Sequence, residues 1–152
     1  MTRGTSLRYT APMSETASET LGTFAAREIE RLRELPQPIV RVSGPLTCDG
    51  PEGYAANTAR LAQAEAQLAA SGETVYRFGD AEAEIQDRGY AHADIMEHFH
   101  SPVLASGCIA AAYFLPRWEE STGARIEREL CAQHGIAIRE FPEAWFDESP
   151  QA

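Results

Sequence analysis

Residues 109–127, IAAAYFLPRWEESTGARIE, decide the fold of this chain. The first seven residues, 109–115, are all apolar or aromatic, which suits a strand buried on both faces and is too short for a membrane span. Pro116 ends this run, and Ser121 then offers a helix N-cap. Apolar residues recur at helical spacing after it: Ala124, Ile126 and Leu130. The stretch therefore predicts a buried parallel strand, a polar loop and a helix.

The predicted helix carries a candidate functional carboxylate. Glu127 lies four residues after Gly123, about one turn into the helix. In open α/β sheets, ligands bind in the crevice beyond the carboxyl ends of the strands, beside helix N-termini. We hypothesise that Glu127 points into such a crevice. The alternative is a surface residue that pairs with Arg117, Arg125 or Arg128.

Strand and helix patterns alternate along the rest of the chain. Besides residues 109–115, we expect strands at residues 39–43, 74–78 and 136–139. Helical patterns separate them at residues 54–70, 92–105 and 121–134. A strand–helix–strand unit implies a parallel pair with a right-handed crossover. The sequence therefore predicts an α/β three-layer sandwich on a short parallel sheet of about four to five strands.

The chain divides into three parts. Residues 1–13 lack periodicity, and we expect a flexible arm. Residues 14–36 describe an amphipathic helix that packs on the sheet or on a partner subunit. Residues 37–152 form the single predicted domain, and its acidic tail is expected to tuck aromatic side chains against the body: Phe141, Trp145 and Phe146.

Composition and charge exclude several classes of protein. The formal net charge is −10, there is no lysine, and the arginines are scattered. Because proteins that bind a phosphate backbone usually carry a basic patch, we expect no nucleic-acid polymer as a partner. No apolar run approaches 18 residues and the N-terminus has no apolar signal core, so we expect a cytoplasmic protein without membrane contact.

The cysteine and histidine spacings predict no metal. The three cysteines, Cys48, Cys108 and Cys131, show no CxxC spacing, which disfavours a structural zinc site and a disulfide framework. The histidines between residues 92 and 100 lack the HExxH pattern.

Loops that follow the strands supply candidate ligand groups. Ser43 and Gly44 follow the first strand, and glycine lets a backbone approach a ligand closely. Ser121 and Thr122 open the helix after the third predicted strand, where free amides can seat a phosphate or simply receive an N-cap. Trp118, in the same loop, could stack on a base or contact a lid or a subunit.

Four motifs carry a resemblance to a known family. They are VSGPLT at residues 42–47, YxxN at 54–57, HADIM at 92–96 and LPxWExSxGARxE at 115–127. Over about residues 39–140 the chain resembles the nucleoside 2-deoxyribosyltransferase-like superfamily, and within it the DUF4406-type branch. The resemblance implies a flavodoxin-like parallel sheet, no cofactor and a homo-oligomer, either a dimer or a tetramer.

The resemblance also implies roles for individual residues. The family's catalytic glutamate stands four residues after the motif's glycine, which is Glu127 here. An aspartate that contacts the base or the sugar matches Asp94. Ser121 stands where the branch that hydrolyses nucleoside 5′-monophosphates has a phosphate-binding serine. Other residues complete the predicted substrate site: Ser43, Gly44, Pro45, Trp118, Thr122 and Gly123.

The resulting expectation is cleavage of the N-glycosidic bond of a nucleoside 5′-monophosphate, with Glu127 as nucleophile. A carboxylate can stabilise the oxocarbenium character that develops on the sugar, by charge or by covalent attack. Three alternatives stay open. They are deoxyribosyl transfer between bases, a non-catalytic module that senses or binds nucleotides, and an assembly protein whose function depends on the N-terminal helix.

Overall fold

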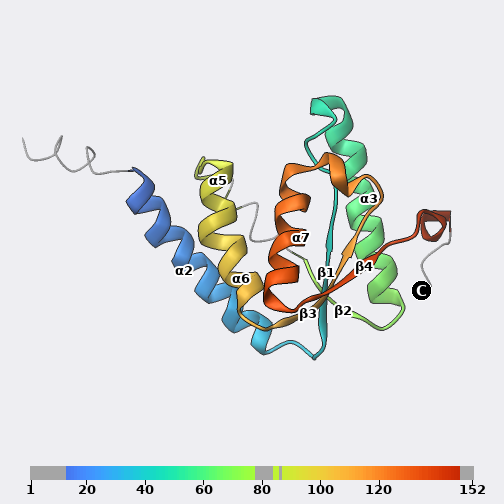
Figure 1. Cartoon of the computed structure of the whole chain (residues 1–152), viewed down its shortest axis with the longest axis horizontal. Coiled ribbons are helices and arrows are strands. Elements are labelled where there is room, and N and C mark those ends of the chain that lie inside the picture. Colours follow the sequence, from blue (N-terminus) through green and yellow to red (C-terminus); the bar gives the residue numbers. More distant parts are fainter. Residues whose placement is uncertain (1–12, 78–83, 86, 148–152) are drawn as a thin grey trace, which may run out of the picture.

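The computed structural model describes residues 13–77, 84, 85 and 87–147, and a four-stranded sheet forms its centre (Figure 1). The strands are β1 (Ile39–Ser43), β2 (Thr74–Tyr76), β3 (Ile109–Phe114) and β4 (Ala137–Glu140). Their order is β2-β1-β3-β4, and every neighbouring pair is parallel. The predicted α/β fold, a flavodoxin-like sandwich with an extra N-terminal helix, is confirmed.

Helices cover both faces of the sheet (Figure 1). The face that we call the α7 face carries α2 (Met13–Arg33), α5 (His92–Ile95), the π-helical turn η1 (Met96–His100), α6 (Ser101–Ala105) and α7 (Thr122–His134). The opposite face, the α3 face, carries α3 (Gly50–Ala70) and the 3-10 turn η3 (Glu143–Asp147). A second 3-10 turn, η2 (Trp118–Glu120), joins β3 to α7.

Side chains of β1 alternate between the two faces, as the period of a strand requires. Ile39 belongs to the apolar core under α2 and α7, and Arg41 and Ser43 contact α7 on the same face. Val40 and Val42 belong to the core under α3. The predicted tail contact is confirmed there, because aromatic side chains close this second core: Phe141, Trp145 and Phe146.

The strand order creates a topological switch point at the centre of the sheet. From β1 the chain passes through α3 to β2 on one side, whereas β3 lies on the other side. In open α/β sheets of this kind, ligands bind beyond the carboxyl ends of the two central strands. Here these ends are Ser43 of β1 and Phe114 of β3.

Several boundaries differ from the sequence predictions. Helix α3 begins at Gly50 rather than residue 54, since Pro51 stands in its first turn, where proline is tolerated. Strand β2 ends at Tyr76, and β4 begins at Ala137. Met13 already belongs to α2, and the remainder of the predicted arm, residues 1–12, lies outside the described residues.

The predicted helix at residues 92–105 is three consecutive segments, α5, η1 and α6. Pro102 lacks the N–H that would bond to the carbonyl of His98 four residues earlier. The chain forms the π turn η1 directly before it, which buries Met96, Phe99 and His100. Turns of this kind occur frequently at functional sites.

Helix α2 shares its apolar core with the sheet. It contacts η1 and α6 closely, and four of its described apolar side chains are buried: Leu21, Phe24, Ala25 and Leu32. The amphipathic pattern thus packs on this chain's own body. In the described ranges no helix, α2 included, has the length and apolar character that a membrane crossing requires.

Candidate functional site

A cleft of about 890 Å³ opens at the switch point of the sheet. Its floor is formed by the end of β1 and the first two turns of α7. The loop after β1, one side of α3, and the α5–η1 segment supply its walls. This position is the one where open α/β sheets bind ligands.

Glu127 lies on the floor of the cleft and is 6% exposed. Arg41 Nη2 donates to Glu127 Oε2 at 2.6 Å, and the Ser43 hydroxyl donates to Glu127 Oε1. Both donors project from the same face of β1 because they stand two residues apart in a strand. The carboxylate is therefore fixed at both oxygens by the strand beneath it.

Arg41 and Glu127 form a buried ion pair. Burial of Arg41 disfavours its charge, yet Glu127 holds the pKa of the guanidinium above its ordinary value. Burial, followed by the charge of Glu127, raises the pKa of the neighbouring Cys131 thiol to about 11. At neutral pH the Arg41 guanidinium on the floor of the cleft is therefore charged, and the Cys131 thiol, which lies in the apolar core, is protonated.

His100 borders the same carboxylate from the end of η1. Its Nδ1 lies 3.7 Å from Glu127 Oε2, and the residue is 7% exposed. Burial, and then the positive charge of Arg41 and the nearby His92, lower the pKa of His100 well below its ordinary range. The imidazole is therefore neutral at pH 7 and adds no second positive charge to the floor.

The N-terminus of α7 forms one end of the cleft. Ser121 is its N-cap, and the Ser121 Oγ accepts a hydrogen bond of 3.1 Å from the Ala124 amide. Thr122 and Gly123 follow along the cleft wall, and the His92 imidazole lies beside Gly123. The first amides of a helix have no partner within the helix and favour anions.

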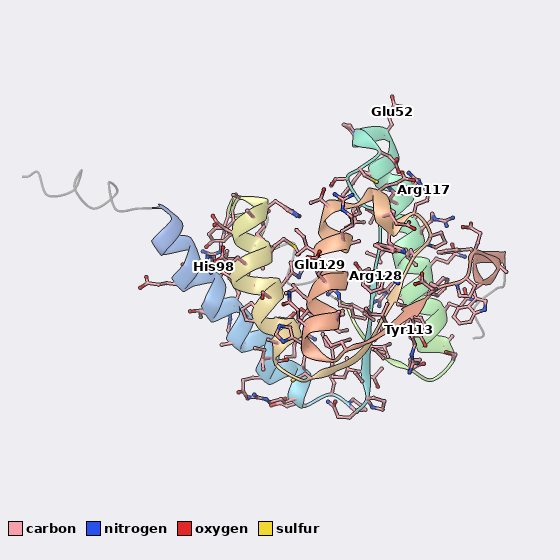
Figure 2. The ribbon with its side chains drawn as sticks, viewed as in Figure 1. Glu52, His98, Tyr113, Arg117, Arg128 and Glu129 are labelled. Carbon is pink, nitrogen blue, oxygen red and sulfur yellow. The ribbon has the colours of Figure 1, made fainter. Side chains whose placement is uncertain are left out.

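A salt-bridge clamp joins the loops after β1 and β3. Arg117 Nη2 donates to Asp49 Oδ1 at 2.6 Å and to Glu120 Oε1 at 2.7 Å, and Asn57 Nδ2 donates to Asp49 Oδ2 at 2.9 Å. The hydrogen bonds from Arg117 are the main reason that the pKa values of the Asp49 and Glu120 carboxyls lie below their usual range. Arg117 adopts a left-handed φ of 71° in this position (Figure 2 shows it next to α3).

The remaining walls combine apolar and charged side chains. Apolar and aromatic residues come from the loop after β1, from α3 and from η1: Leu46, Tyr54, Leu61 and Met96. Tyr54 is 40% exposed, which leaves its ring available to a ligand. At the end of β2, Arg77 Nε lies 3.6 Å from Glu65 Oε1. The cleft can therefore stack a flat ring and bind polar edges.

A family model for a domain of unknown function, DUF4406, matches residues 39–140. The chain belongs to the DUF4406 family. The match runs from the first residue of β1 to the last residue of β4, so the cleft lies within the DUF4406 domain, whereas α2 and η3 lie outside it. Comparisons with curated proteins and with solved structures gave no match.

Six of the predicted site residues line the cleft of this DUF4406 domain together: Ser43, Gly44, Ser121, Thr122, Gly123 and Glu127. Three of them have partners within the protein. The Ser43 hydroxyl, predicted to belong to the substrate site, donates to Glu127, and Ser121 caps α7. Glu127 itself pairs with Arg41, and none of the three arginines weighed from the sequence pairs with it.

Three predicted site residues do not line the cleft. Asp94 is half-buried on α5 and is not among the lining residues, whereas His92 of α5 and Met96 and His100 of η1 line the cleft. Pro45 lines a separate cavity of about 400 Å³ beside Leu115.

Trp118 is also turned away from the cleft. Its ring meets Phe114 edge-on at 6.0 Å, and the Arg128 guanidinium lies 4.1 Å from the ring centroid. These contacts fix the indole against the core of the α7 face. Trp118 is not among the residues that line the cleft, and Tyr54 is the exposed aromatic side chain that lines it.

Sequence reasoning missed Arg41 and His100. Arg41 stands between two valines in the buried strand IVRVS, two residues before Ser43 and on the same face of the strand. A charge at such a position signals a buried partner, because an unpaired buried charge is very costly. His100 carried no such signal, since the π turn that aims it at Glu127 is a consequence of tertiary packing.

Metal-ligating atoms converge at one place among the residues that the structure describes. Ligand atoms of Cys48, Asp49 and Glu120 lie within 4.8 Å of one another. Arg117 already donates to both carboxylates, so the positive charge that a cation would supply is present. A metal would have to displace this guanidinium.

Proposed function

We propose that the cleft binds a nucleoside 5′-monophosphate and that Glu127 cleaves its N-glycosidic bond. The observation that carries the proposal is the meeting, in one cleft, of a fixed, cation-paired carboxylate with the amide-rich start of α7. The motif at residues 115–127 supports it further, because its resemblance to the nucleoside 2-deoxyribosyltransferase-like superfamily implies a catalytic glutamate at Glu127.

The proposed reaction has two steps. A Glu127 oxygen attacks C1′, and the C1′–N bond breaks with its electron pair leaving on the base, which takes up a proton from water. Water then attacks C1′, releases the 5-phosphosugar and returns Glu127 as a carboxylate. This is the scheme of a retaining glycosidase, in which a carboxylate forms a covalent glycosyl intermediate. Transfer to a second base instead of water is the close variant.

The chain's own side chains have defined tasks in this scheme. Arg41 keeps a positive charge beside Glu127 and the Ser43 hydroxyl fixes its second oxygen, so the carboxylate needs no reorganisation. The α7 amides at Thr122 and Gly123 would receive the phosphate. Tyr54 offers a ring on which a base can stack.

A second candidate, a module that binds nucleotides without turnover, has one observation in its favour. Both carboxylate oxygens of Glu127 already accept hydrogen bonds, and the residue is 6% exposed. A carboxylate held in this way can line a binding site without acting as a nucleophile. Each carboxylate oxygen has two lone pairs, so attack on C1′ stays feasible with these bonds in place.

The test is release of free base from a panel of ribo- and deoxyribonucleotides and their nucleosides, followed by chromatography. We expect release from the 5′-monophosphates and a loss of about three orders of magnitude or more in Glu127→Gln. The matched control is Glu129→Gln, since Glu129 is exposed on the same helix (Figure 2). It should retain the activity of the unmodified chain.

The panel also separates the alternatives. Exchange with an added free base identifies a transferase. Binding in calorimetry without base release identifies the sensing module. Undiminished base release in Glu127→Gln, with the variant folded by circular dichroism, would reject Glu127 as nucleophile.

A further inference from the structure

We propose that helix α2, which lies outside the matched DUF4406 segment, is part of the site. Glu28 of α2 and Tyr76 of β2 act as positioning residues for Arg41, and through Arg41 for Glu127. The role of these residues in catalysis rests on the proposed function. The contacts that link Glu28 to Glu127 are observed in the structure and do not depend on it.

Glu28 is a buried carboxylate on α2, 7% exposed. The Tyr76 hydroxyl donates to Glu28 Oε2 at 3.1 Å. On the same helix, Arg31 Nε donates to Glu28 Oε1 at 2.7 Å and Arg31 Nη2 donates to Glu28 Oε2 at 2.9 Å. A carboxylate removed from water in this way is stabilised by its partners and holds them in one geometry.

Tyr76 connects Glu28 to the floor of the cleft. It is 2% exposed and pairs in register with Arg41 across the β1–β2 ladder. The Arg41 guanidinium lies 5.8 Å from the centroid of the Tyr76 ring. Burial raises the pKa of Tyr76, so its hydroxyl stays protonated and keeps donating to Glu28.

Charges alternate along this chain of contacts from the surface of α2 to the cleft. Arg31 is followed by Glu28, the Tyr76 hydroxyl and ring, Arg41 and finally Glu127. Arg41 has a long side chain with many rotamers, and the Tyr76 ring and the Glu127 carboxylate are among the neighbours that restrict it. The Glu28 bond fixes the ring, so α2 reaches the reacting carboxylate through three contacts.

Two variants keep side-chain shape while breaking the connection. Tyr76→Phe removes the hydroxyl, and Glu28→Gln removes the negative charge that orders Arg31 and Tyr76. The matched controls are Tyr113→Phe and Glu30→Gln. Tyr113 (Figure 2) is a buried tyrosine on the α3 face with a glutamate, Glu73, 3.4 Å from its hydroxyl, and Glu30 forms an exposed salt bridge with Arg33 on α2.

Two readouts report on the floor of the cleft. The first is base release from the best nucleotide, where we expect kcat to fall by about tenfold to hundredfold with KM unchanged, because a displaced Arg41 misplaces Glu127. The second is the NMR titration of His100, which faces Arg41 from β1, Glu127 from α7 and His92 from α5. Displacement of Arg41 should raise its midpoint by about one pH unit.

The readouts keep this inference separate from the proposed function. A His100 shift in Tyr76→Phe and Glu28→Gln, absent in both controls, supports the connection even in a protein that releases no base. Unchanged His100 titration in both folded variants overturns it, whatever the activity. In an active enzyme, a His100 shift with kcat unaltered also overturns the positioning role.

Discussion

The two faces of β1 bury their side chains against different partners. On the α3 face, Val40 and Val42 pack in a core with Ala64 and Leu68 of α3. On the α7 face, the neighbouring Arg41 and Ser43 meet a carboxylate. Apolar burial stabilises a fold by about 25 cal/mol per Å². A buried ion pair contributes little net stability, because desolvation offsets the Coulomb attraction.

The difference teaches where function resides in this fold. The α3 face is explained by packing, whereas the ion pair on the α7 face is a costly arrangement at the point where open α/β sheets bind ligands. Sequences break the rule of apolar cores mostly at functional sites. The stability lost through a substitution on the α7 face should therefore change when Glu127 is also substituted, whereas the stability lost on the α3 face should not.

Arg41→Met should have the largest effect on stability. Methionine fills much of the volume but leaves Glu127 buried without its cation, so we expect the free energy of unfolding to fall by about 3–5 kcal/mol. Urea unfolding followed by circular dichroism measures this loss. Adding Glu127→Gln to Arg41→Met should restore part of it, because the unpaired charge disappears.

A substitution on the α3 face supplies the control for these single and double variants. Val42→Ala lowers stability through lost packing, and Glu127→Gln should not compensate for it. Additive losses in the Arg41→Met and Glu127→Gln double variant would show that the pair carries no coupling and would remove the contrast between the faces.

Gly44→Ala should have an intermediate effect, since Gly44 lies where the two faces meet. It follows Ser43 in the cleft, and a Cβ at this position would stand 2.8 Å from Leu115 Cβ on the α3 face. The resulting overpacking should cost about 1–3 kcal/mol in urea unfolding. Gly22→Ala on α2 is the control, because an added Cβ there meets nothing within 4 Å, and a stability no lower than that of the original chain is expected.

The elements of the fold were predictable from local patterns. The apolar run that became β3 ends before Pro116, Ser121 caps α7, and Gly135 ends it with a left-handed φ of 74°. These signals act within a few residues, so one sequence suffices to read them. The π turn before Pro102 and the early start of α3 departed from the simple helical period.

The partners within the site were not predictable in the same way. Arg41 and Glu127 are 86 residues apart in sequence, and their contact arises only when β1 and α7 pack together. The sequence pointed to Glu127 through a motif, yet could not say that the Ser43 hydroxyl would donate to this carboxylate instead of to a ligand. Asp94 shows the same limit, since its motif carries no information on which side of α5 faces the cleft.

The smallest expected effect is a dependence of the free energy of unfolding on pH, which arises from His100 on the α7 face. His100 on the α7 face is neutral in the folded chain because its pKa is depressed, whereas the unfolded chain binds a proton at about pH 6.5. As the pH falls below that value, the unfolded state takes up a proton that the folded state resists. Stability should therefore decrease by up to about 1.4 kcal/mol per pH unit.

His100→Gln should flatten this decrease in urea unfolding at pH 7.5, 6.5 and about 5.5. The exposed His134 serves as control, and His134→Gln should leave the slope in place. Asp49 and Glu120 have depressed pKa values through Arg117, but carboxyls of this kind lose their contribution only near pH 4 and below, outside the window. Equal slopes for His100→Gln and the original chain would mean that His100 binds its proton alike in the folded and the unfolded chain, and that burial beside Arg41 does not disfavour its charge.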